Sequence, residues 1–84
     1  MKTINYTRKA IKVLAKLPKN TAELIRSKVR EYAADPASLA NNVTALKGRT
    51  DGAVRLRVAD WRVIMRNGEV LDVLDVGPRG SVYE

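Results

Sequence analysis

The stretch Ala53–Met65, AVRLRVADWRVIM, decides how this chain folds. Apolar and basic residues alternate along it with a period of two, which is typical of β-strands that have two unlike faces. A reversal at Ala59 and Asp60 divides the stretch into a hairpin of two antiparallel strands. In the register that this reversal sets, Arg57 lies directly opposite Arg62.

The two faces of the predicted hairpin differ in chemistry. The apolar face carries Leu56, Val58, Trp61, Val63 and Met65. The other face carries Arg55, Arg57, Arg62 and Arg66, with Ile64 among them. Like charges directly opposite each other destabilise a sheet by roughly 0.2–1 kcal/mol per pair. Folding therefore does not require the arginines, and a polyanionic partner would account for them. The alternative is an ordinary solvated face on which arginine stems cover apolar surface.

A third strand is predicted after the hairpin. The Asn67-Gly68 pair is a strong signal for a two-residue turn, in which Arg66 would face Glu69. The following segment, Glu69–Val76, is apolar at both parities, which indicates a strand that is covered on both faces. Helices can cover one of these faces. On the other face we expect an apolar surface to be left partly bare beside the arginines, formed by Ile64, Leu71 and Val73.

Two amphipathic helices are predicted in the first half of the chain. Thr7 is a suitable N-cap for a helix over Arg8–Leu17, where apolar residues recur at helical spacing. Asn20–Glu23 has the pattern of a capping box and opens a second helix that runs to about Ala34. The helices form a hairpin whose narrow apolar stripes both pack on one face of the sheet.

The remaining segments complete an α+β fold. Lys2–Tyr6 is predicted to be a short strand at a sheet edge, and residues 37–52 are predicted to be a loop that brings Lys47 and Arg49 beside the sheet. The expected order is an N-terminal strand, a two-helix hairpin and a three-stranded antiparallel sheet, with the helices on one sheet face. At 84 residues we expect one domain, residues 1–84.

Composition limits the chemistry that the chain can perform. The net charge of +7 favours nucleic acid or an acidic protein as a partner. The absence of cysteine and histidine excludes thiol nucleophiles, histidine-dependent triads and zinc sites with Cys or His ligands. Any catalysis must use Arg, Lys, Tyr, Asp or Glu, which suits charge stabilisation better than proton transfer at neutral pH. No metal and no cofactor are expected.

The sequence contains no apolar run of 18 residues and no apolar core of a signal peptide. We therefore expect a cytoplasmic location and no membrane partner.

Short motifs follow one another over nearly the whole chain. They are Tyr6, Ala10, Leu14 and Leu17-Pro18; Asp35-Pro36; Leu46-Lys47-Gly48; Arg55, Arg57, Asp60-Trp61-Arg62-Val63; and Val76-Gly77-Pro78-Arg79-Gly80 with Val82-Tyr83. In this order and spacing they resemble the RelE/ParE superfamily of bacterial toxins from type II toxin–antitoxin systems. The combination of Arg62, Arg79 and Tyr83 is more similar to the RelE branch.

The resemblance implies a function and a set of site residues. RelE-type toxins are ribosome-dependent endoribonucleases that cut mRNA in the ribosomal A site, and each is neutralised in a complex with its cognate antitoxin. By position, Arg62 matches the arginine near the scissile phosphate, Arg79 the arginine in the turn after the last strand, and Tyr83 the tyrosine near the C-terminus. Arg55 stands where the family has a lysine, and Ala53 replaces another lysine. Both departures disfavour a lysine base and preserve charge stabilisation.

Further roles follow from these positions. We expect the reaction to be attack of an mRNA ribose 2′-hydroxyl on its own adjacent phosphate, so that the substrate supplies the nucleophile. The remaining basic residues of the hairpin and of the preceding loop are expected to bind RNA: Lys47, Arg49, Arg57 and Arg66. The antitoxin is expected to bind the apolar surface of Ile64, Leu71 and Val73. Trp61 is expected to be a core residue rather than a platform for RNA bases.

Other functions remain open on the sequence alone. The chain is also compatible with a ParE-like toxin that poisons DNA gyrase, because a shared fold does not fix function. A basic RNA-binding module without catalysis and a toxin that has lost its activity are further alternatives.

Overall fold

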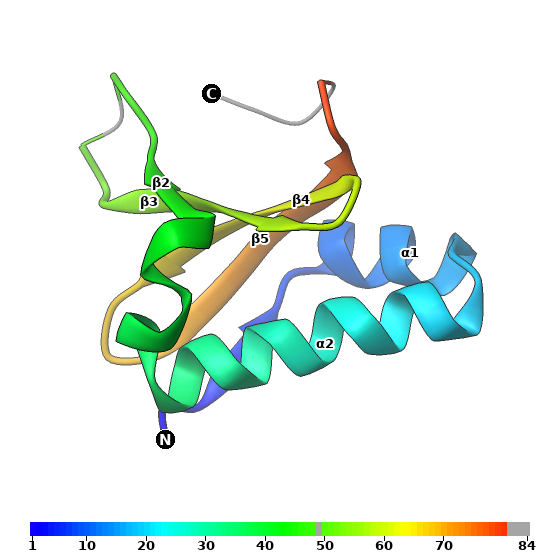
Figure 1. Ribbon diagram of the computed structural model, residues 1–84, viewed down its shortest axis with the longest axis horizontal. Coiled ribbons are helices and arrows are strands. Elements are labelled where there is room, and N and C mark those ends of the chain that lie inside the picture. The colour runs from blue at the N-terminus through cyan, green and yellow to red at the C-terminus, as the bar shows by residue number, and fades with distance from the viewer. Residues whose placement is uncertain (49, 81–84) are drawn as a thin grey trace.

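The protein combines a five-stranded sheet with two helices, as the computed structural model describes it for residues 1–48 and 50–80 (Figure 1). The elements in chain order are β1 Ile4–Tyr6, α1 Arg8–Lys16, α2 Lys19–Ala34, the 3₁₀ segment η1 Pro36–Asn42, β2 Val43–Ala45, β3 Ala53–Val58, β4 Trp61–Asn67 and β5 Leu71–Pro78. The strand order is β1-β5-β4-β3-β2, with β1 parallel to β5 and all other neighbours antiparallel. The predicted α+β class and the position of the first strand at a sheet edge are confirmed.

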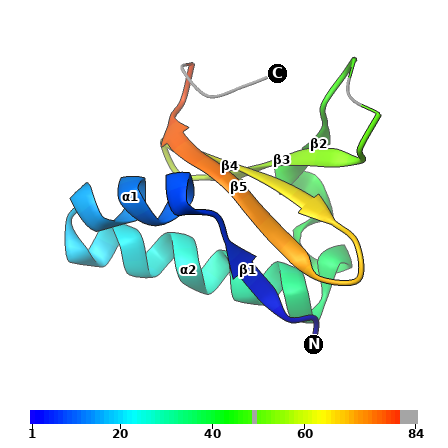
Figure 2. The same ribbon diagram turned by 180° about the vertical axis from the view of Figure 1, so that it is seen from behind.

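Both helices lie on the same face of the sheet, as predicted (Figures 1 and 2). Leu14 of α1 and Ile25 and Val29 of α2 are buried against the strands. The sheet side of this core includes Leu56, Val58, Val63, Met65, Leu71, Val73 and Val76. Each fully buried Leu, Ile or Val side chain contributes about 1.5–3 kcal/mol. The other sheet face carries no helix of residues 1–48 and 50–80, and we call it the open face.

The two helices begin in different ways. Thr7 caps α1, because its Oγ1 accepts a hydrogen bond from the Ala10 N–H at 3.2 Å. The capping box predicted for α2 is wrong. Pro18 occupies the N-cap, no side chain bonds the first turn, and Asn20 already lies inside the helix. Proline suits the start of a helix because its fixed φ matches helical geometry and its missing N–H would have no partner there.

The central hairpin has the predicted register. Leu56 pairs with Val63 and Arg57 pairs with Arg62 across β3 and β4. The reversal uses Ala59, whose φ of 52° is in the left-handed region, together with the following residue. A residue with a side chain costs about 1–2 kcal/mol in this conformation. The turn is therefore held by its surroundings rather than by local preference.

The predicted register of the second hairpin is wrong. Arg66 faces Asp72 rather than Glu69, and β5 is Leu71–Pro78 rather than residues 69–76. Three residues connect β4 to β5, and the β4–β5 ladder has an irregularity between Ile64 and Met65. Two interactions stabilise this longer connection: the ion pair from Arg66 to Asp72, and the pairing of β1 with β5.

The segment predicted to be a loop over residues 37–52 contains two ordered elements. Its first part is the 3₁₀ segment η1, and its second part, β2, pairs antiparallel with β3. Leu39 of η1 joins the main core. The sheet therefore has a fifth strand, at the edge next to the arginine-bearing hairpin.

The bare apolar surface predicted from Ile64, Leu71 and Val73 is absent from the part of the chain that the structure describes. Leu71 and Val73 are 0% exposed because they belong to the helix-covered core. Ile64 lies on the open face but is only 5% exposed, because it packs in a small second cluster with Leu46 and Ala53. The prediction was wrong because the β4–β5 register turns both β5 residues toward the helices, and because the segment after β2 covers Ile64.

No helix among residues 1–48 and 50–80 is long and apolar enough to cross a lipid bilayer.

A polar network fastens three strands together at one end of the open face. Arg66 Nη2 donates to Asp72 Oδ2 at 3.1 Å, and Asn5 Nδ2 donates to Asp72 Oδ1 at 2.9 Å. These hydrogen bonds from Asn5 and from Arg66 lower the pKa of Asp72 from its ordinary value of 3.8. Because the lowered pKa favours the ionised carboxylate in the folded state, Asp72 contributes stability above pH 4 and loses it as the pH falls through the lowered value.

We predict that Asp72→Asn lowers the melting temperature at pH 7 and that the difference from wild type narrows as the pH falls below about 4. Thermal unfolding followed by circular dichroism at pH 7 and near pH 3 measures this. Glu69→Gln, an exposed change in the β4–β5 connection, is the matched control and is expected to show no such narrowing. A difference for Asp72→Asn that stays constant with pH would contradict the assignment.

Candidate functional site

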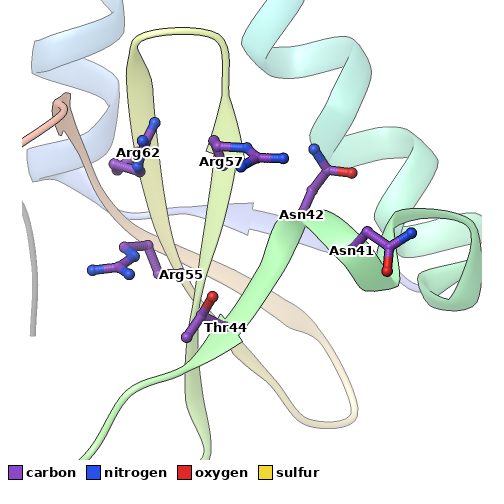
Figure 3. A pocket seen from close by; sticks show the side chains of 6 residues that line it. All are labelled: Asn41, Asn42, Thr44, Arg55, Arg57 and Arg62. Atoms are coloured by element: carbon purple, nitrogen blue, oxygen red, sulfur yellow. The ribbon is translucent and has the colours of Figure 1, made fainter.

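Arginines of the central hairpin gather on the open face. The alternation of β3 turns Leu56 and Val58 toward the helices and Arg55 and Arg57 away from them. Arg62 projects from β4 on the same side, as Figure 3 shows. The arginine-bearing face that the sequence predicts is therefore present.

A cavity of about 140 Å³ opens among these side chains. Its lining residues are Asn41 and Asn42 at the end of η1, Thr44 of β2, and Arg55, Arg57 and Arg62 (Figure 3). We call it the arginine cavity. Three guanidinium groups, two amides and one hydroxyl surround it, so hydrogen-bond donors dominate its walls. Donors and permanent positive charge together suit a phosphate or another anion.

Arg62 is held in place by the backbone of its own turn. Its Nη1 donates to the carbonyl of Trp61 at 2.8 Å and to the carbonyl of Ala59 at 3.1 Å. Both bonds use the same nitrogen of a guanidinium that has five N–H donors. The side chain is thus oriented in the absence of any ligand, which lowers the entropy cost of binding one.

In the described part of the chain, two of the three arginines of the cavity have no carboxylate nearby to neutralise their charge. Within residues 1–48 and 50–80, no carboxylate lies within 4 Å of Arg57 or Arg62. Arg66, by contrast, lies 3.1 Å from Asp72 and 3.9 Å from Asp51. The hairpin therefore has a neutralised arginine at one end, Arg66, and two arginines with no described carboxylate nearby at the other, Arg57 and Arg62.

The structure brings some of the other predicted site residues near the cavity. Arg79 follows β5 at the same end of the sheet as Arg62, because its backbone N–H donates to the carbonyl of Asp60 in the β3–β4 turn at 2.8 Å. It does not line the arginine cavity. Lys47 lines a neighbouring cavity of about 170 Å³. Arg49 and Tyr83 lie outside the described residues.

Trp61 is half-buried and packs against the main core, as predicted.

The sequence interpretation missed three residues of the cavity wall: Asn41, Asn42 and Thr44. They come from η1 and β2, which the sequence indicated only as a loop. The available signal was the β-forming Val43-Thr44 pair, and a strand of three residues is too short to show a period of two.

The cavity is suited to stabilising negative charge rather than to moving protons. Its cations are arginines, which stay protonated in proteins. The chain has no histidine and no cysteine. A reaction at this site would draw its nucleophile from the substrate or from water, and the protein would contribute orientation and positive charge.

Comparisons with known proteins agree with this architecture. Among solved structures, the chain is similar to an archaeal RelE in a RelE–RelB complex from Pyrococcus horikoshii OT3, with a TM-score of 0.80, 24% identity and coverage of 96% of this chain and 98% of that one. It is also similar to a chain of the intact Escherichia coli RelBE toxin–antitoxin complex, with a TM-score of 0.71, 23% identity and coverage of 93% and 96%. The isolated Escherichia coli RelE toxin gives a TM-score of 0.72, 22% identity and coverage of 98% and 88%.

No curated protein sequence matches the chain. The family model for the ParE toxin of the type II toxin–antitoxin system parDE matches residues 4–83, nearly the whole chain. The superfamily resemblance seen in the sequence motifs is confirmed by this match, and the fold is that of the RelE structures. The chain therefore belongs to the ParE toxin family, within the RelE/ParE superfamily of toxins from type II toxin–antitoxin systems.

Proposed function

We propose that this toxin is an endoribonuclease that cuts mRNA on the ribosome in the cytoplasm. The observation that carries the proposal is the arginine cavity, in which three arginines from two paired strands surround one space large enough for a phosphate group. Placing Arg57 directly opposite Arg62 does not stabilise the fold, whereas the two cations together stabilise the negative charge of a phosphodiester.

The reaction that suits this site is an internal transfer at phosphorus. The ribose 2′-oxygen bonds to the adjacent phosphorus, the bond from phosphorus to the 5′-oxygen breaks, and the products carry a 2′,3′-cyclic phosphate and a 5′-hydroxyl. The 2′-hydroxyl loses its proton, and the leaving 5′-oxygen gains one. Negative charge builds on the phosphate oxygens in the transition state, where guanidinium donors stabilise it.

Within this proposal the residues have distinct roles. Arg62, which is oriented by the carbonyls of Ala59 and Trp61, stabilises the phosphate oxygens. Arg55 and Arg57 hold the same or the neighbouring phosphate. Arg79, which lies beside the β3–β4 turn, assists the leaving oxygen.

We propose further RNA contacts for residues outside the three arginines of the cavity. Tyr83 is proposed to stack on a base or to accept the 2′-proton. Lys47 and Arg49 are proposed to bind RNA, whereas Arg66, paired with Asp72, is expected to contribute less.

The proposal includes a cognate antitoxin that forms a hetero-oligomer with the toxin. The structural neighbours include RelE toxins solved with RelB antitoxins. Since Ile64, Leu71 and Val73 are buried, an antitoxin is expected to use another surface. The arginine cavity is suited to an acidic antitoxin segment, which would block mRNA by occupying the same cations.

We predict that Arg62→Ala folds normally and loses on the order of 10²–10³ in the rate of mRNA cleavage, the cost of about 2.7–4 kcal/mol that is typical of removing one transition-state donor. Primer extension on mRNA translated by purified ribosomes measures this rate. Arg30→Ala, an exposed change on α2 away from the open face, is the matched control and is expected to cut at the wild-type rate. Equal cleavage by Arg62→Ala would remove Arg62 from the site.

A second candidate function is inhibition of DNA gyrase, because the matching family model is that of a ParE toxin. The two targets are separated by testing one protein preparation in two assays. We predict cut mRNA ends with programmed ribosomes and no cleaved DNA trapped on gyrase. Trapped DNA together with intact mRNA would favour gyrase as the target. Salt-sensitive RNA binding without cut ends at any ribosome concentration would identify a binding module instead.

A further inference from the structure

The second cavity adjoins the arginine cavity and differs from it in chemistry. It has a volume of about 170 Å³ and is lined by Thr44, Ala45, Leu46, Lys47 and Arg55. Thr44 and Arg55 line both cavities and are paired across β2 and β3. The two cavities are therefore neighbours, and this one residue pair lies between them. We call the second one the Leu46 cavity.

The Leu46 cavity has an apolar base and a basic rim. Leu46 is 7% exposed and packs with Ala53 and Ile64, which form the second apolar cluster of the protein. This cluster lies on the open face, beyond the arginines along the same strands. Lys47, the next residue in the chain after Leu46, supplies a positive charge to the lining of this cavity and does not line the arginine cavity. The open face therefore has a cationic cavity beside a cavity with an apolar base, and Lys47 adds a further positive charge to the second one.

We propose that the two cavities bind one nucleotide of single-stranded RNA, with its phosphate in the arginine cavity and its base in the Leu46 cavity. This inference rests on the proposed function and names the part of the substrate that the second compartment receives. The parts of a nucleotide match these features of the surface. Its anionic phosphate suits the arginines, its flat base with apolar faces suits the Leu46 cavity, and the phosphate of the next nucleotide suits Lys47.

The residues between the compartments suit this arrangement. Arg55 can contact the phosphate with its N–H donors and the base with the flat face of its guanidinium group. Leu46 offers apolar contact to the other part of the base. Stacking and apolar contact accept every base, because each base has a π-face. We therefore expect the Leu46 cavity to orient the nucleotide beside the scissile phosphate with little preference for base identity.

The direct test compares two RNA hexamers that carry the same phosphates. One is a 2′-O-methyl hexamer, which cannot be cut because its 2′-oxygens are capped, and the other is the same hexamer with every base removed. Fluorescence anisotropy gives the two affinities for the full chain. We expect the loss of the bases to weaken binding about 10-fold or more, the range typical of a base that stacks on a protein.

Methyl NMR locates the base without any change to the protein. The Leu46 methyl resonances are expected to shift when the hexamer with bases is added and to stay in place with the abasic hexamer. In Leu46→Ala, removal of the bases from the hexamer is expected to weaken binding by only about 3-fold or less, because the contact between Leu46 and the base is already lost. Val43→Ala, in strand β2 just before Leu46 but packed against the main core, is the matched control and is expected to lose as much affinity on removal of the bases as wild type.

The possible results separate this inference from the proposed function. Equal affinity for the two hexamers, with cleavage that still depends on Arg62, would overturn the base assignment and leave the nuclease in place. Failure to bind either hexamer, with cleavage absent, would overturn both. Leu46 methyl shifts on adding an acidic peptide but not on adding RNA would assign the Leu46 cavity to a protein partner and would overturn the base assignment.

Discussion

The pairing of Arg57 with Arg62 across the central hairpin is the interaction on which this account of the site depends. Two like charges directly opposite each other oppose folding. The hairpin tolerates them because its other face buries Leu56 and Val63, each of which contributes more than the repulsion costs. The turn is tied to the same charges, since Arg62 donates to the carbonyl of Ala59, the residue held at positive φ.

The architecture around the hairpin keeps these charges available. Both helices cover one face of the sheet, so no helix in the described part of the chain covers the open face (Figures 1 and 2). The edge strand β2 adds Thr44 beside Arg55 and gives the open face a wall. Two carboxylates near the hairpin lie at its other end, where Asp72 and Asp51 pair with Arg66. Along β4, Arg66 is paired with a carboxylate of the described residues and Arg62 is not. This separation concentrates positive charge at one end of the open face, where a polyanion can bind.

The sequence predicted what depends on local periodicity and missed what depends on tertiary pairing. Alternation along residues 53–65 was sufficient for the central register and for the face of each arginine. It did not reveal the 3₁₀ segment η1 or the three-residue strand β2, so the wall formed by Asn42 and Thr44 was missed. The Asn67-Gly68 turn signal gave the wrong register, because the ion pair of Arg66 with Asp72 and the pairing of β1 with β5 outweigh local turn preference. That error made Leu71 and Val73 appear to be exposed.

We propose that the arginines of the open face together bind the phosphate backbone of RNA. The most direct measurement is the salt dependence of binding to an uncleavable single-stranded RNA, for wild type and for the triple variant Arg55→Gln, Arg57→Gln and Arg62→Gln. Each phosphate contact on a single strand contributes about 0.7 to the slope of log affinity against log salt. We expect the slope to be shallower by roughly 2 in the triple variant, which lacks three phosphate-binding arginines. An unchanged slope would contradict it.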